Sequence, residues 1–278
     1  MNKPVLHPQS QDHLASVLKD MPQSLLIAGQ PGIGLKTIGQ FIASSLGILP
    51  LIILPEKNDK IDEDSGVVGV DTIRRLYTDT RTKTQAGSEH LVIIHQADRM
   101  TRQAQNAFLK LLEEPNTYTR FVLTSNHPSE LLPTVMSRLQ KVIIRPITTK
   151  QSNQLLDTLG LKDEVKRRQL LFAAEGLPAE LTRLANDEDY FNNRADVIRD
   201  ARTILQDKPY QRLMIIQKYK DDRHAALSLL SDTETLLYKG MVEKPSKDML
   251  KRISSVLKAR QRLEGNGNIR LALLEAFI

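Results

Sequence analysis

The sequence contains no cysteine and no tryptophan, and aromatic residues make up only 4% of it. Without cysteine the chain can form no disulfide bond, no thiolate nucleophile and no cysteine-ligated zinc site. The six histidines lack the paired spacing of metal ligands, so we expect no metal site. The scarcity of aromatic rings also argues against recognition of single-stranded nucleic acid by base stacking.

Long apolar runs are absent as well. No run of about 18 apolar residues is present that could span a bilayer, and the opening MNKPVLHPQS lacks the basic-then-apolar pattern of a secretory signal. We therefore expect no membrane contact and a cytoplasmic location. The formal net charge of +6 suits a phosphate-rich partner such as nucleic acid, although an ordinary basic surface would carry the same charge.

Short apolar segments alternate with helical patterns in the first half of the chain. Uninterrupted apolar runs of this length are typical of strands buried in a parallel sheet that helices cover on both faces. The predicted strands are 24–28, 51–54, 91–94, 120–124 and 142–144. Asp71 and Thr101 are predicted to be helix N-caps, and Pro115 to stop the second of these helices. After Thr148 only helical patterns follow, so the second half is predicted to be all-helical.

A glycine-rich loop, GQPGIGLKT, spans residues 29–37 between the first predicted strand and a predicted helix. Free backbone N–H groups and the positive end of the helix favour phosphate at such a place. In the usual pattern, G-x-x-x-x-G-K-[ST], the lysine meets the β- and γ-phosphates and the hydroxyl holds magnesium. The candidate nucleotide-binding residues are therefore Gly29, Gly32, Gly34, Lys36 and Thr37.

An extra residue, Leu35, interrupts this pattern and leaves two arrangements open. In a loop of normal length, Leu35 takes the lysine place and Lys36 the hydroxyl place, so binding is weak or absent. In a loop that bulges by one residue, Lys36 and Thr37 keep their roles in a distorted cradle. We favour the first arrangement, because one inserted residue at a helix start rotates each later side chain by about 100°.

The third predicted strand is followed by His95 and Gln96, where P-loop ATPases carry two acidic residues. Neutral imidazole is a poor partner for magnesium, which prefers oxygen ligands, and a glutamine amide cannot accept a proton as a base. The interrupted lysine loop and the missing acidic residues are thus two independent defects of a phosphoryl-transfer site. We therefore expect the chain not to hydrolyse ATP.

Several segments between Gly69 and Arg145 resemble, in order and spacing, the clamp-loader branch of the AAA+ ATPases. They are VDTIRRL at 70–76, ADRMT at 97–101, AQNAFLKLLEEP at 104–115, LTSNHP at 123–128 and LLPTVMSR at 131–138. The helix that ends in Leu-Glu-Glu-Pro and the later Leu-Pro-Thr-Val-Met-Ser-Arg are characteristic of this branch. The resemblance covers about the first 185 residues, and it extends to the remainder only in length and helical pattern.

The resemblance implies an α/β fold in three domains. These are a P-loop AAA+ domain with a parallel sheet over 1–146, a small helical lid over 147–191 and an all-helical collar for oligomerisation over 192–278. Glu180 stands where the family's lid usually carries a sensor arginine, so a third nucleotide contact is missing.

The resemblance also implies a role for Arg138, which occupies the arginine of the family's Ser-Arg-Cys motif, with Leu139 in place of the cysteine. In the family this arginine reaches the γ-phosphate of ATP held by a neighbouring subunit, and the guanidinium fork suits that task. Asn126 matches a polar sensor at the end of the fourth strand. The plainer alternatives are an arginine salt-bridged on a sheet edge, for Arg138, and a strand-end turn residue, for Asn126.

A defective site combined with a donated arginine is typical of the non-hydrolysing, stator-like member of the clamp-loader pentamer. The implied partners are motor subunits of the tau/gamma type, a delta-type subunit, primer–template DNA and the sliding clamp. No cofactor is required, and ATP could bind without hydrolysis. The candidates for phosphate contacts to DNA are Arg74, Arg75, Arg99 and Arg102, although a solvated helix face also explains these arginines.

Two other functions stay open. One is an active ATPase of the motor type that works through Lys36 and Thr37, with Asp98 as the nearest acid for magnesium. The other is an AAA+-derived replication adaptor that acts outside any clamp loader. The apolar segment 268–277 fits a helix buried against partner subunits, and it equally fits a core helix.

Overall fold

The computed structural model describes residues 3–63, 65–82, 89–114, 118–206 and 209–278. Two compact units form, Met1–Ala185 and Asn186–Ile278. The predicted boundary at 146/147 lies inside the first unit, and that at 191/192 lies inside helix α9, Glu188–Gln206. The division into three domains stays a prediction.

A five-stranded parallel sheet forms the centre of the first unit, in the order β2-β5-β6-β1-β7. The strands are β1 Ser24–Gly29, β2 Pro50–Ile53, β5 His90–Ile94, β6 Thr119–Ser125 and β7 Gln140–Ile144. All five predicted strands are confirmed, and with them the α/β fold with a parallel sheet. In the centre of the sheet, Leu26 of β1 lies opposite Leu123 of β6 on one side and Lys141 of β7 on the other.

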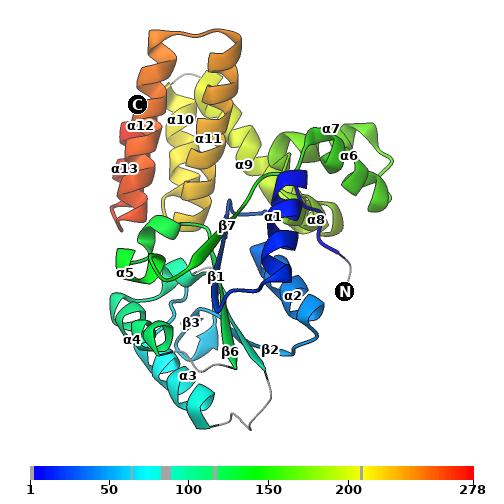
Figure 1. The fold of residues 1–278 in the computed structure, drawn as a ribbon. Helices are drawn as coiled ribbons and strands as arrows, with labels where there is room; N and C mark the ends of the chain where they lie inside the picture. The colour runs from blue at the N-terminus through cyan, green and yellow to red at the C-terminus, as the bar shows by residue number, and fades with distance from the viewer. Residues whose placement is uncertain (1–2, 64, 83–88, 115–117, 207–208) are drawn as a thin grey trace. The chain divides into compact units, whose positions relative to one another are not determined.

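Helices cover both faces of this sheet (Figure 1). Alternate residues of β1 are buried in two separate hydrophobic cores, because successive side chains of a strand point to opposite faces of the sheet. Leu25 and Ile27 pack with α1 and α2, whereas Leu26 packs with α3, α4 and α5. The bounds are α1 Pro8–Lys19, α2 Leu35–Leu46, α3 Val70–Thr82, α4 Arg102–Glu113 and α5 Pro133–Met136. Burial on both faces explains why the strands read as continuous apolar runs.

The two predicted helix caps have different outcomes. Thr101 caps α4, because its Oγ1 accepts the N–H of Ala104 at 3.1 Å. The prediction for Asp71 is wrong, since α3 already begins at Val70. Asp71 lies in the first turn, where its carboxylate still complements the helix dipole and pairs with Arg74 at 3.3 Å. Pro115, predicted to stop α4, lies outside the described residues.

A short hairpin occupies part of 56–66, which shows only a charged connection in the sequence. Strands β3, Glu56–Lys57, and β4, Lys60–Ile61, pair antiparallel. The turn residues Asn58 and Asp59 both have positive φ, 52° and 58°, as a two-residue hairpin turn of type I′ requires. Glu63 lies in the segment that follows this hairpin.

Two 3₁₀ turns lie after strands of the main sheet. Turn η1, Ala97–Arg99, follows β5, and turn η2, Pro128–Glu130, follows β6.

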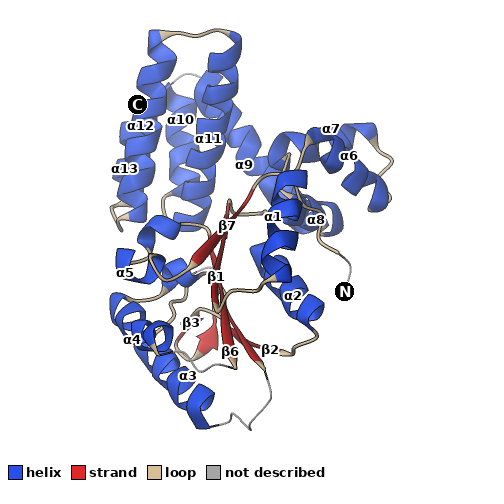
Figure 2. Cartoon of the chain, in the orientation of Figure 1, coloured by secondary structure: helices blue, strands red, loops and turns tan. Residues whose placement is uncertain are grey.

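The rest of the first unit contains helices α6 Thr149–Thr158, α7 Glu164–Ala174 and α8 Pro178–Asn186. The described part of the second unit contains helices only (Figure 2). Apart from α9, these are α10 Pro209–Tyr219, α11 Arg223–Glu243, α12 Lys247–Glu264 and α13 Ile269–Phe277. The helix predicted near the end is confirmed as α13, and Leu273 and Phe277 bury it in the unit's own core. None of the described helices is long and apolar enough to cross a membrane.

Candidate functional site

The glycine-rich loop follows β1 at the edge where the carboxyl ends of β1, β5 and β6 meet. Parallel pairing therefore brings Gly29, His95 and Asn126 together. The Asn126 side-chain amide donates a hydrogen bond to the Gly29 carbonyl at 2.8 Å, and its backbone N–H donates to Asp98 Oδ1 at 3.2 Å. Asn126 thus holds the base of the loop, and its role as a nucleotide sensor stays a prediction.

The loop itself turns through Gly32 and Gly34, whose φ angles are 84° and 91°. Gly34 is the N-cap of α2, and no side chain caps this helix start. Leu35 takes the first helical position and is buried in the core, while Lys36 follows half-buried and Thr37 is exposed. A helix that begins at Leu35 is consistent with a loop of normal length, in which leucine stands in the lysine place.

The N-terminus of α8 packs directly on this loop. The backbone N–H groups of Ala179 and Glu180 both donate to the Gly32 carbonyl at 3.0 Å. A Cβ added at Gly32 would lie 2.9 Å from the Glu180 Cβ, and one at Gly34 would lie 3.2 Å from the Ala179 Cβ. Both glycines are therefore required by close approach as well as by positive φ. A peptide carbonyl of the loop occupies the positive end of α8, where an anion would otherwise bind.

A cluster of polar side chains surrounds Lys36. Its Nζ forms an ion pair with the Glu63 carboxylate, and Glu63 Oε2 lies 3.4 Å from His95 Nε2. On the other side of the ring, His95 Nδ1 lies 2.8 Å from Thr124 Oγ1, which also accepts the backbone N–H of Gln96 at 3.1 Å. The cluster thus connects the loop, the ends of β5 and β6, and the segment after the hairpin.

His95 is neutral in this cluster. Burial lowers the pKa of His95, and this effect outweighs the opposite influence of the Glu63 carboxylate. A carboxylate can only accept hydrogen bonds, so Nε2 carries the ring hydrogen and Nδ1 accepts from the Thr124 hydroxyl. Neutral imidazole leaves this position without a magnesium ligand of the preferred oxygen type.

Gln96, in the second acid place, has a left-handed backbone with φ 51°. Its Oε1 is buried without a hydrogen-bond partner among the described residues. Across the same described part of the chain, no three His, Asp or Glu side chains gather closely enough to hold a metal ion.

Arg138 lies just after α5, with 38% of its side chain exposed. One end of its guanidinium donates to the Thr134 carbonyl at 2.8 Å, and the other pairs with Glu113 Oε1 at 2.8 Å. Leu139, in the family's cysteine place, is buried. The salt-bridged arginine considered as the plainer alternative is therefore present in this chain, while the role of Arg138 on another subunit's ATP stays a prediction.

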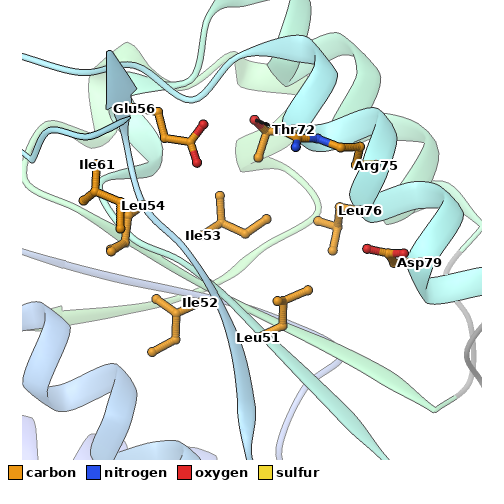
Figure 3. A pocket seen from close by; sticks show the side chains of 10 residues that line it. All are labelled: Leu51, Ile52, Ile53, Leu54, Glu56, Ile61, Thr72, Arg75, Leu76 and Asp79. Carbon is orange, nitrogen blue, oxygen red and sulfur yellow. Dashed lines mark hydrogen bonds between the residues drawn. The ribbon is translucent and has the colours of Figure 1, made fainter. Parts of the chain in front are cut away.

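The four arginines predicted to contact DNA lie on neighbouring helices. Arg74 and Arg75 are exposed on α3, Arg102 is exposed at the start of α4, and Arg99 donates to the Gly66 carbonyl at 3.3 Å. Arg75 lies at one side of a cavity of about 250 Å³ between β2 and α3 (Figure 3). This cavity is lined mainly by apolar side chains, including Leu51, Ile53, Ile61 and Leu76.

Two residues that shape the site, Glu63 and Gln105, are absent from the sequence-based predictions. Glu63 lies in an irregular segment 27 positions from Lys36, and no pattern marks it. Gln105 is a buried polar residue within the apolar stripe of α4, which is a visible signal. Its amide nitrogen donates to the carbonyls of Met100 and Glu130, each at 3.2 Å, and its oxygen accepts the N–H of Leu132 at 2.7 Å.

Comparison with known proteins relates this chain to subunits of DNA polymerase III. The family described as "DNA polymerase III, delta subunit" matches residues 52–148. The DNA polymerase III subunit delta' of Bacillus subtilis is 27% identical over 205 residues, which are 64% of this chain and 62% of the relative. The delta' subunit of Pseudomonas aeruginosa is 30% identical over 156 residues, 56% of this chain and 45% of the relative. The chain is thus similar to clamp-loader subunits of the delta' type.

The chain is also similar to a replication factor C subunit. A replication factor C small subunit of Methanococcus vannielii is 29% identical over 166 residues, 57% of this chain and 51% of the relative. The chain spans between 45% and 62% of the length of these three relatives.

Solved structures agree with the fold. A gamma subunit-related protein of Thermotoga maritima superposes with a TM-score of 0.52 at 18% identity, covering 96% of this chain and 97% of that one. The RuvB branch migration motor of the same organism superposes with a TM-score of 0.51 at 15% identity, over 96% and 87% of the two chains. At these identities the likeness shows the shared fold of clamp-loader and RuvB proteins.

Proposed function

We propose that the chain is a delta-prime-type, non-hydrolysing subunit of a bacterial DNA polymerase III clamp loader. In this role it donates Arg138 to ATP held by a neighbouring motor subunit while the sliding clamp is loaded for DNA replication. The observation that carries the proposal is the site at the end of β5, where neutral His95 and Gln96 stand in the two acid places. Arg138 keeps 38% of its side chain exposed, although it also pairs with Glu113.

The chemistry of such a donated arginine is electrostatic. As the γ-phosphoryl group departs, charge develops on its oxygens, and a guanidinium fork stabilises that charge. Thr134 and Glu113 hold the fork of Arg138 through its two terminal nitrogens, which limits the rotamers it can adopt. The chain's own site has neutral His95 and Gln96 in the acid places, so it lacks a base and a magnesium ligand there.

The role requires partners and no cofactor of its own. We propose motor subunits of the tau/gamma type and a delta-type subunit as neighbours in a hetero-pentamer, with primer–template DNA bound through its phosphates. The named delta' relatives support the type of complex. Retention of ATP without hydrolysis is compatible with the role and is not needed for it.

Replacement of Arg138 tests the proposal in a loader reconstituted with motor and delta-type subunits. Arg138→Ala is expected to lower kcat of the DNA-stimulated ATPase by roughly ten-fold or more, since trans-acting arginines contribute strongly to phosphoryl transfer. Light scattering should show unchanged stoichiometry. Arg168→Ala is the matched control, because Arg168 is an exposed arginine on α7. An unchanged kcat in a complete complex would contradict the trans role.

The second candidate is a motor-type ATPase, favoured by the similarity to replication factor C small subunits. It requires Lys36 and Thr37 to contact nucleotide despite the pairing of Lys36 with Glu63. A phosphate-release assay on the isolated chain separates the two functions. Sustained turnover that Lys36→Ala abolishes would establish the ATPase, and its absence supports the proposed role.

A further candidate is the replication adaptor outside any clamp loader. Failure of the chain to co-purify with motor subunits would favour the adaptor.

A further inference from the structure

Glu63 contacts two elements of the site at once. One carboxylate oxygen pairs with Lys36 on α2, and the other faces the Nε2–H of His95 at the end of β5. In a P-loop ATPase the corresponding two elements face the terminal phosphates and their magnesium ion. In this chain an internal carboxylate therefore lies between the loop lysine and the first acid place.

The surroundings of Glu63 favour a lasting contact. The side chains of Lys36 and Glu63 are 38% and 35% exposed, and that of His95 is 10% exposed. Thr124 fixes the far side of the imidazole at 2.8 Å, so the ring presents its N–H to Glu63 in one orientation. Glu63 thus receives one cation and one fixed donor, which is a better-defined setting than an isolated surface ion pair has.

We propose that Glu63 is an internal anion that takes the place of a polyphosphate at Lys36. It thereby closes the chain's own glycine-rich loop to polyphosphate ligands. A polyphosphate that approaches Lys36 must displace the carboxylate, and until then it meets like charge at short range. Its natural ligand class, once Glu63 is removed, is polyphosphate, either free or as the tail of a nucleotide. The inference concerns the chain's own loop and does not depend on the role of Arg138.

Removal of the carboxylate on the full-length, isolated chain tests this inference. Titration calorimetry with sodium tripolyphosphate is expected to show only weak binding to the wild type. The Glu63→Ala and Glu63→Gln variants should bind at least roughly ten-fold more tightly, which corresponds to about 1.4 kcal/mol. Glu56→Gln is the matched control, since Glu56 is a partly exposed carboxylate in the preceding hairpin. Adding Lys36→Ala to Glu63→Ala should abolish the gained binding.

A second titration with ATP distinguishes the ligand's source. Binding of both ATP and tripolyphosphate to Glu63→Ala would support a closed nucleotide site, and binding of tripolyphosphate alone would support a closed anion site. Folded Glu63 variants that bind neither ligand better than Glu56→Gln would overturn the inference.

Chemical reactivity of Lys36 supplies a readout that needs no ligand. Because the Glu63 carboxylate covers part of the Lys36 ammonium group, acylation of Lys36 by a water-soluble ester should be slower than acylation of exposed Lys150. In Glu63→Ala the Lys36 rate should rise several-fold, and the Lys150 rate should not change. Equal rates at the two lysines in the wild-type chain would also overturn the inference. Neither the titrations nor the acylation assay involves a neighbouring ATPase subunit. A negative result in them therefore leaves the proposed role of Arg138 untouched.

Discussion

Among single residues, His95 connects the site to the stability of the first unit. Its pKa is lowered below 6.5 mainly by burial, so the unfolded chain binds a proton at a higher pH than the folded chain does. Between the folded pKa and 6.5 the unfolded state therefore holds more protons, and the free energy of unfolding rises with pH. The charged groups that face the ring are Glu63, Lys36, Asp98 and Arg99.

Replacement of His95 should flatten this dependence. We expect wild-type stability to fall as pH decreases below 6.5, and His95→Gln to lose less stability over the same range because its side chain does not titrate. Urea unfolding at a series of pH values measures the difference, with His127→Gln as a control at an exposed histidine. Parallel slopes for wild type and His95→Gln would show that His95 is not the titrating group.

At the scale of elements, the contact between the glycine-rich loop and α8 can be tested with two glycines that share a backbone conformation. Gly32 and Gly47 have φ angles of 84° and 69°, so an alanine at either position costs roughly 1 kcal/mol of backbone strain. At Gly47 a new Cβ meets nothing within 4 Å, whereas at Gly32 it meets the Glu180 Cβ at 2.9 Å.

Gly32→Ala should therefore destabilise the chain by more than Gly47→Ala does. The extra loss is expected to be about 1–3 kcal/mol, the typical cost of overpacking a fitted contact. Denaturant unfolding of the two variants measures it, and the Gly47 variant accounts for the strain that the two positions share. Equal losses would mean that the loop and α8 separate readily.

The contrast between strands and site shows which features the sequence could predict. Strands buried on both faces appear as unbroken apolar runs, so their existence and nearly their ends follow from local pattern. The start of α3 does not, because both Val70 and Asp71 fit near a helix start and tertiary packing decides between them. The pairing of Glu63 with Lys36 joins segments 27 positions apart, and only the folded chain brings these two residues together.

At the scale of the whole molecule, the net charge of +6 favours DNA binding through specific contacts only where cationic side chains can reach phosphate groups. Of the four arginines predicted to contact DNA, Arg74 pairs with Asp71, Arg75 contacts Thr72, and Arg99 contacts the Gly66 carbonyl. Arg102 is exposed at the N-terminus of α4, where the helix dipole adds to its positive charge. Arg102 is thus the best placed of the four for a phosphate contact.

We expect Arg102→Glu to weaken binding of primer–template DNA by the reconstituted loader. A lost phosphate contact should also reduce the slope of log K against log salt by about 0.9, because fewer counterions are released on binding. Fluorescence anisotropy at several salt concentrations gives both quantities. Arg168→Glu, which makes the same charge change on α7, separates a local contact from a general effect of net charge. If the two variants lose affinity and slope equally, Arg102 makes no specific contact, and the basic surface acts on DNA only through its overall charge.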